Sequence, residues 1–238
     1  MTDGDDGNDP LVRRDALIAA AMPHVPFDGW SVAALRAGAR DLALPDGDVE
    51  VLFPGGVRQA VRHFSHWADR RMLAALDEVD LTELRIREKV ALAVELRLKV
   101  LEPHREAVRR GLSWLAMPQN AMLGTRLLCR TVDDIWHAIG DRSVDFSFYT
   151  KRGLLAGVVG STTLFWLDDD SEDGAETSAF LHRRIGDVMK IQGARRRVEG
   201  LKGPQGLRGG TPNPFRILRD AVVKRYGAGG RFGDSRFT

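Results

Sequence analysis

Residues 145–170 read DFSFYTKRGLLAGVVGSTTLFWLDDD, and the interpretation of the whole chain starts from this stretch. Fifteen residues without a charge run from Gly153 to Leu167, between a basic pair and three aspartates. The run is shorter than the roughly 20 apolar residues that span a bilayer. Its length and composition favour a buried helix of a bundle over residues 148–167.

Small residues recur inside this apolar run. Gly153, Gly157 and Ser161 are spaced four apart, and Gly160 adds a further glycine. Each glycine costs about 1 kcal/mol of helix propensity relative to alanine. Several in one helix therefore indicate that the space beside it matters, either for close approach of a neighbouring backbone or for a ligand between helices.

The rest of the chain shows helical periodicity and no convincing alternating run, so the sequence predicts an all-α fold. Apolar residues recur every three or four positions at Val61, Phe64, Ala68, Met72 and Ala75, and again from Ile86 to Leu101. Asp28 or Ser31 is the expected N-cap of the second helix. We expect helices over 11–22, 30–42, 45–52, 57–79, 84–101, 105–115, 119–139, 148–167 and 172–199.

The lengths of these helices predict the domain organisation. Three short helices before a bundle of longer ones are typical of a helix-turn-helix-like module joined to a regulatory bundle. The predicted parts are a disordered N-terminus over 1–10, the module over 11–53, a ligand-binding and dimerisation bundle over 54–199, and a flexible basic tail over 200–238.

Charge divides the chain unevenly, although the net formal charge is only +2. Residues 183–238 hold 14 Lys+Arg against 4 Asp+Glu, a net of +10, which leaves −8 for the remainder. The acidic start resembles neither a secretory signal nor a mitochondrial transit peptide. With Cys129 as the single cysteine, a reducing, cytoplasmic and bacterial setting is expected.

No residue pattern indicates catalysis, a metal or a cofactor. His63 and His66 are spaced to share a metal, but no further ligands cluster nearby, so an ordinary surface pair is expected. Cys129 is expected in the core rather than as a nucleophile. The carboxylates of residues 168–170 are expected in solvent at a helix end. We therefore expect a protein without enzymatic activity.

The third short helix bears on DNA binding. It carries Asp46, Asp48 and Glu50, each of which would face the phosphates of a duplex. A DNA-reading helix needs Arg, Lys, Asn or Gln instead. DNA binding is therefore not expected, and a ligand-responsive repressor remains the alternative.

The quoted stretch continues as DFSFYTKRGLLAGVVGSTTLFWLDDDSED and is followed by TSAFLHRRIGDVM. It resembles the signature of the ubiquinone (coenzyme Q) biosynthesis accessory proteins, a lipid-binding family with a TetR-repressor-like fold. The front of the chain, PHVPFDGWSVAALRAGARDLALPDGDVEVLFPGG, is similar to the first three helices of that family. The resemblance covers about residues 11–195.

The resemblance implies a two-fold dimer of helical subunits without enzymatic activity. Such proteins bind isoprenoid quinone precursors or other lipids, associate with the membrane, and present the lipid to the di-iron hydroxylase of the quinone ring. The resemblance assigns the hydroxylase patch to Phe148, Tyr149, Lys151 and Arg152. In relatives, the first aromatic residue is often Trp, and Phe148 keeps the apolar bulk without the indole donor.

Two further sets of residues are expected to contact lipid. The small-residue helix provides the expected cavity contacts, which are Leu154, Leu155, Gly157, Val158, Ser161, Phe165 and Trp166. A terminal amphipathic helix over 214–226 matches the membrane-contacting helix of the family, with expected contacts at Phe215, Leu218, Arg219, Val222, Arg225 and Tyr226. We expect a peripheral protein of the bacterial inner membrane that contacts isoprenoid quinone or phospholipid.

Overall fold

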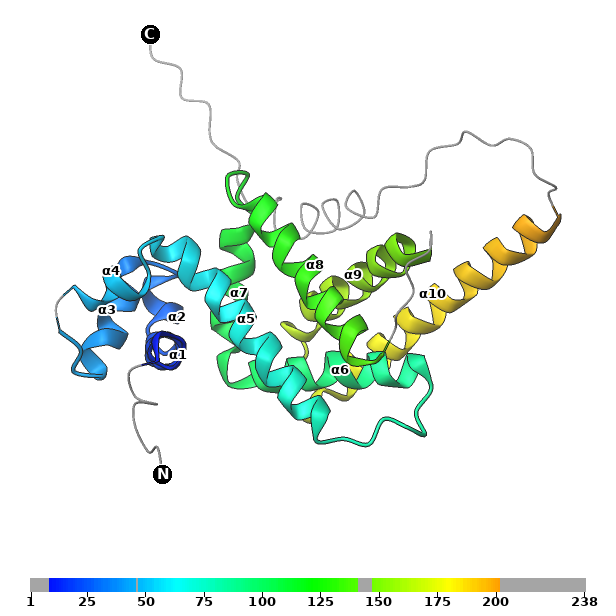
Figure 1. Ribbon diagram of the computed structural model, residues 1–238, viewed down its shortest axis with the longest axis horizontal. Helices are drawn as coiled ribbons and strands as arrows, with labels where there is room; N and C mark the ends of the chain where they lie inside the picture. The colour runs from blue at the N-terminus through cyan, green and yellow to red at the C-terminus, as the bar shows by residue number, and fades with distance from the viewer. Residues whose placement is uncertain (1–8, 46, 141–146, 202–238) are drawn as a thin grey trace, which may run out of the picture.

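The computed structural model describes residues 9–45, 47–140 and 147–201, and every regular element within these ranges is a helix (Figure 1). The all-α prediction is therefore confirmed. The elements are α1 (Pro10–Ala21), α2 (Val25–Asp28), α3 (Val32–Asp41), α4 (Asp48–Leu52), α5 (Gly56–Asp77), α6 (Ile86–Leu101), the 3-10 turn η2 (Glu102–His104), α7 (Arg105–Leu115), α8 (Ala121–Ala138), α9 (Ser147–Trp166), the 3-10 turn η3 (Glu172–Gly174) and α10 (Ala175–Leu201).

Helices α1 to α4 form a small module at one end of the molecule (Figure 1). Ser31 caps α3 through a bond from the backbone amide of Ala34, which confirms one of the two expected caps. Helices α1 and α3 cross at Gly38, where an added Cβ would lie 2.5 Å from the backbone nitrogen of Ala21. The crossing therefore requires a residue without a side chain at position 38.

The short helix α2 was missed in the sequence because Pro26 lies inside it. Proline is tolerated in the first turn of a helix, where its missing N–H would have no intrahelical partner. The indole of Trp30, just beyond α2, donates to the carbonyl of Ala107 at 2.9 Å. This buried bond joins the module to α7 of the bundle.

The acids of α4 have arginine partners within the module. Asp48 pairs with Arg13 at 2.6 Å, and Glu50 pairs with Arg36 at 2.7 Å. Arg14 donates to the carbonyl of Leu52 and fixes the end of the helix. The helix has only five residues, fewer than the predicted 45–52.

Helix α5 is the central rod of the bundle, packed against α6 and α8 and about 33 Å long (Figure 1). Four of its five predicted stripe residues are buried, and Ala75 is half-buried. At its middle, Asp69 is only 2% exposed, and it accepts hydrogen bonds from Arg97 of α6 and Thr131 of α8. This buried charge is thus paired and hydrogen-bonded, as burial requires.

Two predictions about side-chain burial in α5 and α6 are wrong. Ile86 was expected in the core, but it is the first residue of α6, and its side chain is 61% exposed. His63 was expected on the surface, but it is buried with its ring edge-to-face against Phe53, and its Nε2 lies 2.6 Å from Asp15 of α1. Burial lowers the pKa of His63 more than the neighbouring Asp15 raises it.

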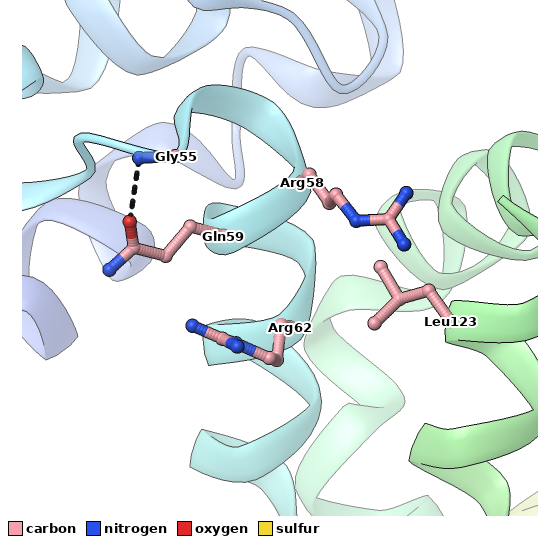
Figure 2. Close-up of a pocket in the computed structure, with 5 residues that line it drawn as sticks. All are labelled: Gly55, Arg58, Gln59, Arg62 and Leu123. Atoms are coloured by element: carbon pink, nitrogen blue, oxygen red, sulfur yellow. Dashed lines mark hydrogen bonds between the residues drawn. The ribbon is translucent and has the colours of Figure 1, made fainter. Parts of the chain in front are cut away.

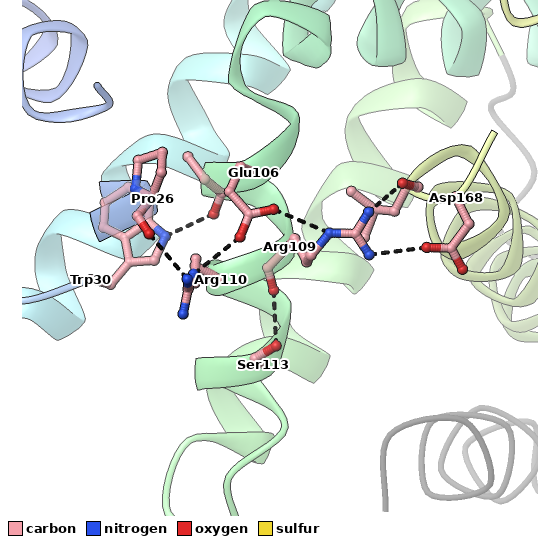
Figure 3. A network of polar contacts seen from close by, with 9 residues as sticks. Pro26, Trp30, Glu106, Arg109, Arg110, Ser113 and Asp168 are labelled. Atoms are coloured by element: carbon pink, nitrogen blue, oxygen red, sulfur yellow. Dashed lines mark hydrogen bonds and ion pairs between the residues drawn. The ribbon is translucent and has the colours of Figure 1, made fainter. Parts of the chain in front are cut away.

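Helix α7 links the module to the far end of α9 (Figure 3). On one side, Arg110 donates to the carbonyl of Pro26 at 3.0 Å. On the other, Arg109 donates to the carbonyl of Leu167 and pairs with Asp168 at 2.9 Å. Glu106 lies between the two arginines and pairs with both, at 3.1 and 3.2 Å.

Candidate functional site

The predicted cavity contacts all lie on α9, but on two different faces of it. Leu155, Val158 and Trp166 are buried in the hydrophobic core. Leu154, Gly157, Ser161 and Phe165 are only half-buried. The structure therefore divides the predicted set into core residues and residues that remain accessible.

The accessible residues form one stripe along the helix. Between Gly153 and Leu167 the half-buried positions are 153, 154, 157, 160, 161, 164 and 165, which recur at the three- and four-residue spacing of a helix face. We call this set the α9 stripe. The Ser161 hydroxyl donates to the carbonyl of Gly157 at 2.7 Å, so its polarity is satisfied inside the helix. The stripe therefore presents a mainly apolar surface.

Gly157 lies at the centre of the α9 stripe and faces open space. Within the described residues, a Cβ built on it would meet no atom of a neighbouring element within 4 Å. Close approach of a neighbouring backbone therefore does not explain Gly157 among the described residues. The interpretation that remains there is space for a ligand or another group.

Helix α10 extends the stripe at its C-terminal end. The rings of Phe165 and Phe180 stack with centroids 4.5 Å apart and planes 10° apart. The guanidinium of Arg184 lies 5.3 Å from the Phe180 ring and pairs with Asp187 at 2.8 Å. The apolar surface is thus bordered by a cation that already has partners.

The start of α9 carries the predicted partner patch. Arg152 forms an ion pair with Asp133 of α8, and the ammonium of Lys151 lies 5.9 Å from the ring of Trp136. Both basic side chains are half-buried against α8. Phe148 and Tyr149 stand in the first turn of α9, and their side chains lie outside the described part.

The end of α9 is held by η2 and α7. The Trp166 indole donates to Glu102 at 2.7 Å, and Arg105 lies over the indole ring at 4.9 Å. Arg105 also donates to the carbonyl of Asp169 at 2.5 Å. These contacts give Trp166 a structural role at the base of the stripe.

The prediction that all three aspartates after α9 lie in solvent is wrong for Asp169, which is 5% exposed. Its carboxylate accepts bonds from the amide of Ser171 at 2.9 Å and from the amide and hydroxyl of Thr177 at 2.8 and 2.5 Å. Burial alone would raise the pKa of Asp169, but these hydrogen bonds outweigh it and lower the pKa to about 2. Asp169 therefore fixes the turn into α10 as a charged group.

Two depressions lie elsewhere on the described surface. The first, of about 180 Å³, is lined by Gly55, Arg58, Gln59, Arg62 and Leu123 (Figure 2). The second, of about 330 Å³, lies between the α5–α6 loop and the end of α8, beside Asp77, Lys89 and Ile139. Neither depression is lined by a residue of the α9 stripe. The first depression was not predicted from the sequence, although its two arginines are four residues apart on α5.

Part of the prediction lies outside the described residues. This applies to the terminal helix over 214–226 with its contacts at Phe215, Leu218, Arg219, Val222, Arg225 and Tyr226, and to Asp46. Cys129, expected in the core, is half-buried, and burial raises the pKa of its thiol.

Comparison with known proteins identifies the family. A family profile described as COQ9 matches residues 121–192. The chain is 34% identical over 202 residues to Ubiquinone biosynthesis protein COQ9-B, mitochondrial, from Xenopus laevis, covering 81% of this chain and 69% of that protein. The chain belongs to the COQ9 family. It is also 36% identical to the COQ9 protein of Rattus norvegicus, of which it spans 64%.

The fold of this COQ9 family member is similar to that of a TetR transcriptional regulator from Nitrosomonas europaea. The two structures superpose with a TM-score of 0.63 at 21% sequence identity, covering 75% of this chain and 98% of the regulator. This likeness confirms the predicted TetR-repressor-like bundle with its helix-turn-helix-like module. At such low identity it shows the fold alone.

Proposed function

We propose that this chain is a non-enzymatic, lipid-binding accessory protein of ubiquinone biosynthesis. Its COQ9 relatives are named ubiquinone biosynthesis proteins, which supports the pathway. In this role the chain binds an isoprenoid quinone precursor or another lipid and presents it to the di-iron hydroxylase of the quinone ring. A homodimer at the inner membrane is part of the proposal.

The observation that carries lipid binding is the α9 stripe. It is mainly apolar, it is accessible, and its central glycine faces open space. An isoprenoid chain needs an apolar surface without unpaired donors, and the internally bonded Ser161 provides one. Phe165 and Phe180 extend this surface onto α10.

The hydroxylase is proposed to dock at the start of α9. Phe148 and Tyr149 precede the basic pair, and Lys151 and Arg152 are fixed against α8 by the contacts described above. A rigid basic pair beside two aromatic residues has the composition of an interface anchor. The distance along α9 between this patch and Phe165 is about 25 Å, so lipid and partner contacts share one helix.

Membrane association is proposed to involve the basic tail, through Phe215, Leu218, Arg219, Val222, Arg225 and Tyr226. No helix in the described part of the chain is long and apolar enough to span a bilayer. A repressor function has only the TetR-like fold in its favour. Helix α4 offers a duplex no lysine or arginine, and its two acids pair within the module.

Native mass spectrometry of the purified full chain, with lipid extraction from the same sample, tests lipid binding. The wild-type protein is expected to carry isoprenoid quinone or phospholipid. Gly157→Leu is expected to reduce the bound lipid at least fivefold, because leucine fills space that is open among the described residues. Gly186→Leu, at another helical glycine with open space, is the matched control.

The outcomes separate the parts of the proposal. A wild-type protein without lipid would overturn lipid binding. Loss of the dimer in Gly157→Leu with lipid retained would assign the α9 stripe to self-association instead.

A pull-down with the di-iron quinone hydroxylase tests the partner patch. The double variant Phe148→Ala and Tyr149→Ala is expected to retain the helical circular dichroism spectrum and to lose at least tenfold in hydroxylase affinity. Arg130→Ala, on the exposed surface of α8, is the control and should bind as wild type. Equal retention of wild type and double variant would remove these aromatics from the interface.

A further inference from the structure

Helix α5 begins beside the turn between α7 and α8, and this region has an unusual charge content. Residues 51–68 and 107–132 supply it, and they contain six arginines but no aspartate or glutamate. The whole chain of 238 residues has 33 acidic residues. Since α5 packs along α8, the two acid-free segments lie together and form a strongly cationic region.

Three of these arginines lack a carboxylate partner within the described residues. Arg58 has only neutral acceptors, the carbonyl of Gln119 at 3.5 Å and the side-chain oxygen of Asn120 at 3.4 Å. No ion pair in the described part of the chain involves Arg62 or Arg126, and both are exposed. In contrast, Arg109 and Arg110 pair with Glu106, and Arg130 pairs with Asp134.

Two exposed methionines stand beside these arginines. Met117 lies in the turn between α7 and α8 and is 44% exposed, and Met122, in the first turn of α8, is 62% exposed. Arg126 follows Met122 by one helical turn, and Arg58 reaches the turn through Gln119. We call Arg58, Arg62, Met117, Met122 and Arg126 the cationic corner.

The first depression lies within this corner and is open to solvent. Figure 2 shows Arg58 over Leu123, while Arg62 points toward the other side of the depression, near Gln59. The two guanidinium groups therefore diverge. This arrangement suits several separate anionic groups spread over a surface better than one small anion held between the two.

We propose that the cationic corner is a second membrane-docking surface, which binds the phosphates of an anionic lipid bilayer through its arginines and inserts Met117 and Met122 among the acyl chains. Each cation near such a surface contributes about a fivefold gain in affinity. Arginine stems lie along apolar surface while their charged ends reach phosphate. The inference rests on the proposed membrane association, but it assigns a contact in the folded bundle rather than in the tail.

Charge and apolar exposure together favour lipid over other anionic partners. A nucleic acid would engage the arginines but would leave the two methionines in solvent. A bilayer accommodates both kinds of side chain, with phosphate outside and hydrocarbon beneath. The opposite end of α5 is acidic and would be repelled, so the molecule would dock with its cationic corner toward the lipid.

A site-specific fluorescent probe tests this proposal on the full chain. Met122→Cys in a Cys129→Ala background carries an environment-sensitive dye, and Ile86→Cys in the same background is the control, since Ile86 has nearly the same exposure, 61%. The vesicles consist of phosphatidylcholine with about 30% of the anionic lipid phosphatidylglycerol. They are expected to shift the emission of the dye at position 122 to the blue. Position 86 should not respond.

Unlabelled variants provide an independent measurement by vesicle flotation. The triple variant Arg58→Gln, Arg62→Gln and Arg126→Gln should bind the anionic vesicles at least tenfold more weakly than wild type. Met117→Ser with Met122→Ser should also weaken binding. The matched control, Arg85→Gln, Arg87→Gln and Ile86→Ser, should stay within about twofold of wild type. Thermal unfolding confirms that each variant is folded.

The outcomes distinguish this inference from the proposed function. Flotation of the protein without a shift at position 122 would overturn the corner as a docking surface and leave membrane association to the tail. Failure of the wild-type protein to float would overturn both. If the dye at position 122 shifted its emission with duplex DNA but not with vesicles, the partner of the cationic corner would be a nucleic acid rather than a lipid bilayer.

Discussion

An exposed apolar side chain lies near each end of α5, and the two have opposite electrostatic surroundings. Met122 stands at the cationic corner near the start of α5, and Ile86 follows the loop after its end, with exposures of 62% and 61%. Both have arginines nearby. However, the loop over residues 77–85 contains four acidic residues, whereas the corner has none. Exposure of an apolar side chain alone therefore does not identify a docking surface, and the surrounding charge does.

Helix stability does not explain this separation of charge. Carboxylates near a helix C-terminus interact unfavourably with the macrodipole, by about 0.3–1 kcal/mol each. Nevertheless, α5 ends with Asp77 followed by Glu78, and it has no basic residue in its last turn. Along α5, about 22 Å separate Arg62 from Asp77 and about 28 Å separate Arg58 from Asp77. This separation of charge orients the molecule in an external field.

Reversing the charge of the loop should produce the largest change in affinity for anionic vesicles. Glu78→Lys with Glu83→Lys replaces two exposed acids by bases beside Ile86. Each added lysine contributes about 1 kcal/mol near an anionic lipid surface, so the two together should increase binding to phosphatidylglycerol vesicles about 25-fold. Flotation over a series of lipid concentrations measures this increase. The dye at position 86 should then respond to vesicles.

The control for this charge reversal is Glu78→Gln with Glu83→Gln, which removes the acids without adding bases. It should raise vesicle affinity less than the lysine variant. An unchanged affinity in the lysine variant would show that charge at this end of α5 does not reach the lipid, and that docking geometry is fixed elsewhere.

A smaller effect concerns two aspartates in similar turns, one in the acidic loop and one buried. Asp80 accepts bonds from the amide and hydroxyl of Thr82 and is exposed, and these bonds lower its pKa. Asp169 accepts corresponding bonds from Ser171 and Thr177, and its pKa falls to about 2. Because its pKa is depressed by folding, Asp169 stabilises the protein above its unfolded pKa, and this stabilisation is lost as the pH falls through about 2.

Urea unfolding at pH 5 and pH 3 measures this contribution. The wild-type protein should lose about 1 kcal/mol of its free energy of unfolding over this interval through Asp169 alone. Asp169→Asn should lack that part of the pH dependence, whereas Asp80→Asn should retain it. The same pH dependence in Asp169→Asn and wild type would contradict a charged, hydrogen-bonded Asp169.

Helix positions followed from the sequence because apolar periodicity and end signals are local. The predicted bounds of α7 agree with the structure, and Ser31 caps α3 as one alternative proposed. The burial of polar residues could not be predicted from the sequence, because it depends on partners far along the chain. His63 is buried by its contact with Asp15, 48 residues away, and Asp169 by donors on the following helix.

The candidate site was also predicted only in part. The small residues on α9 include Gly157, which faces open space among the described residues. Periodicity could not say which of the seven expected lipid contacts face inward, since α9 is apolar on nearly all sides. The cationic corner combines two segments about 60 residues apart, and only the packing of α5 on α8 brings them together.

The contact between Trp30 and α7 has a mechanical consequence. A Cβ on Gly111 would lie 3.2 Å from the Trp30 indole nitrogen, so the ring and the helix backbone fit with little slack. Arg110 adds a second attachment at Pro26, and Arg109 attaches the same helix to the end of α9. The module of α1 to α4 is therefore connected through α7 to the base of the α9 stripe, so a displacement of the module would be transmitted along this helix to the end of α9.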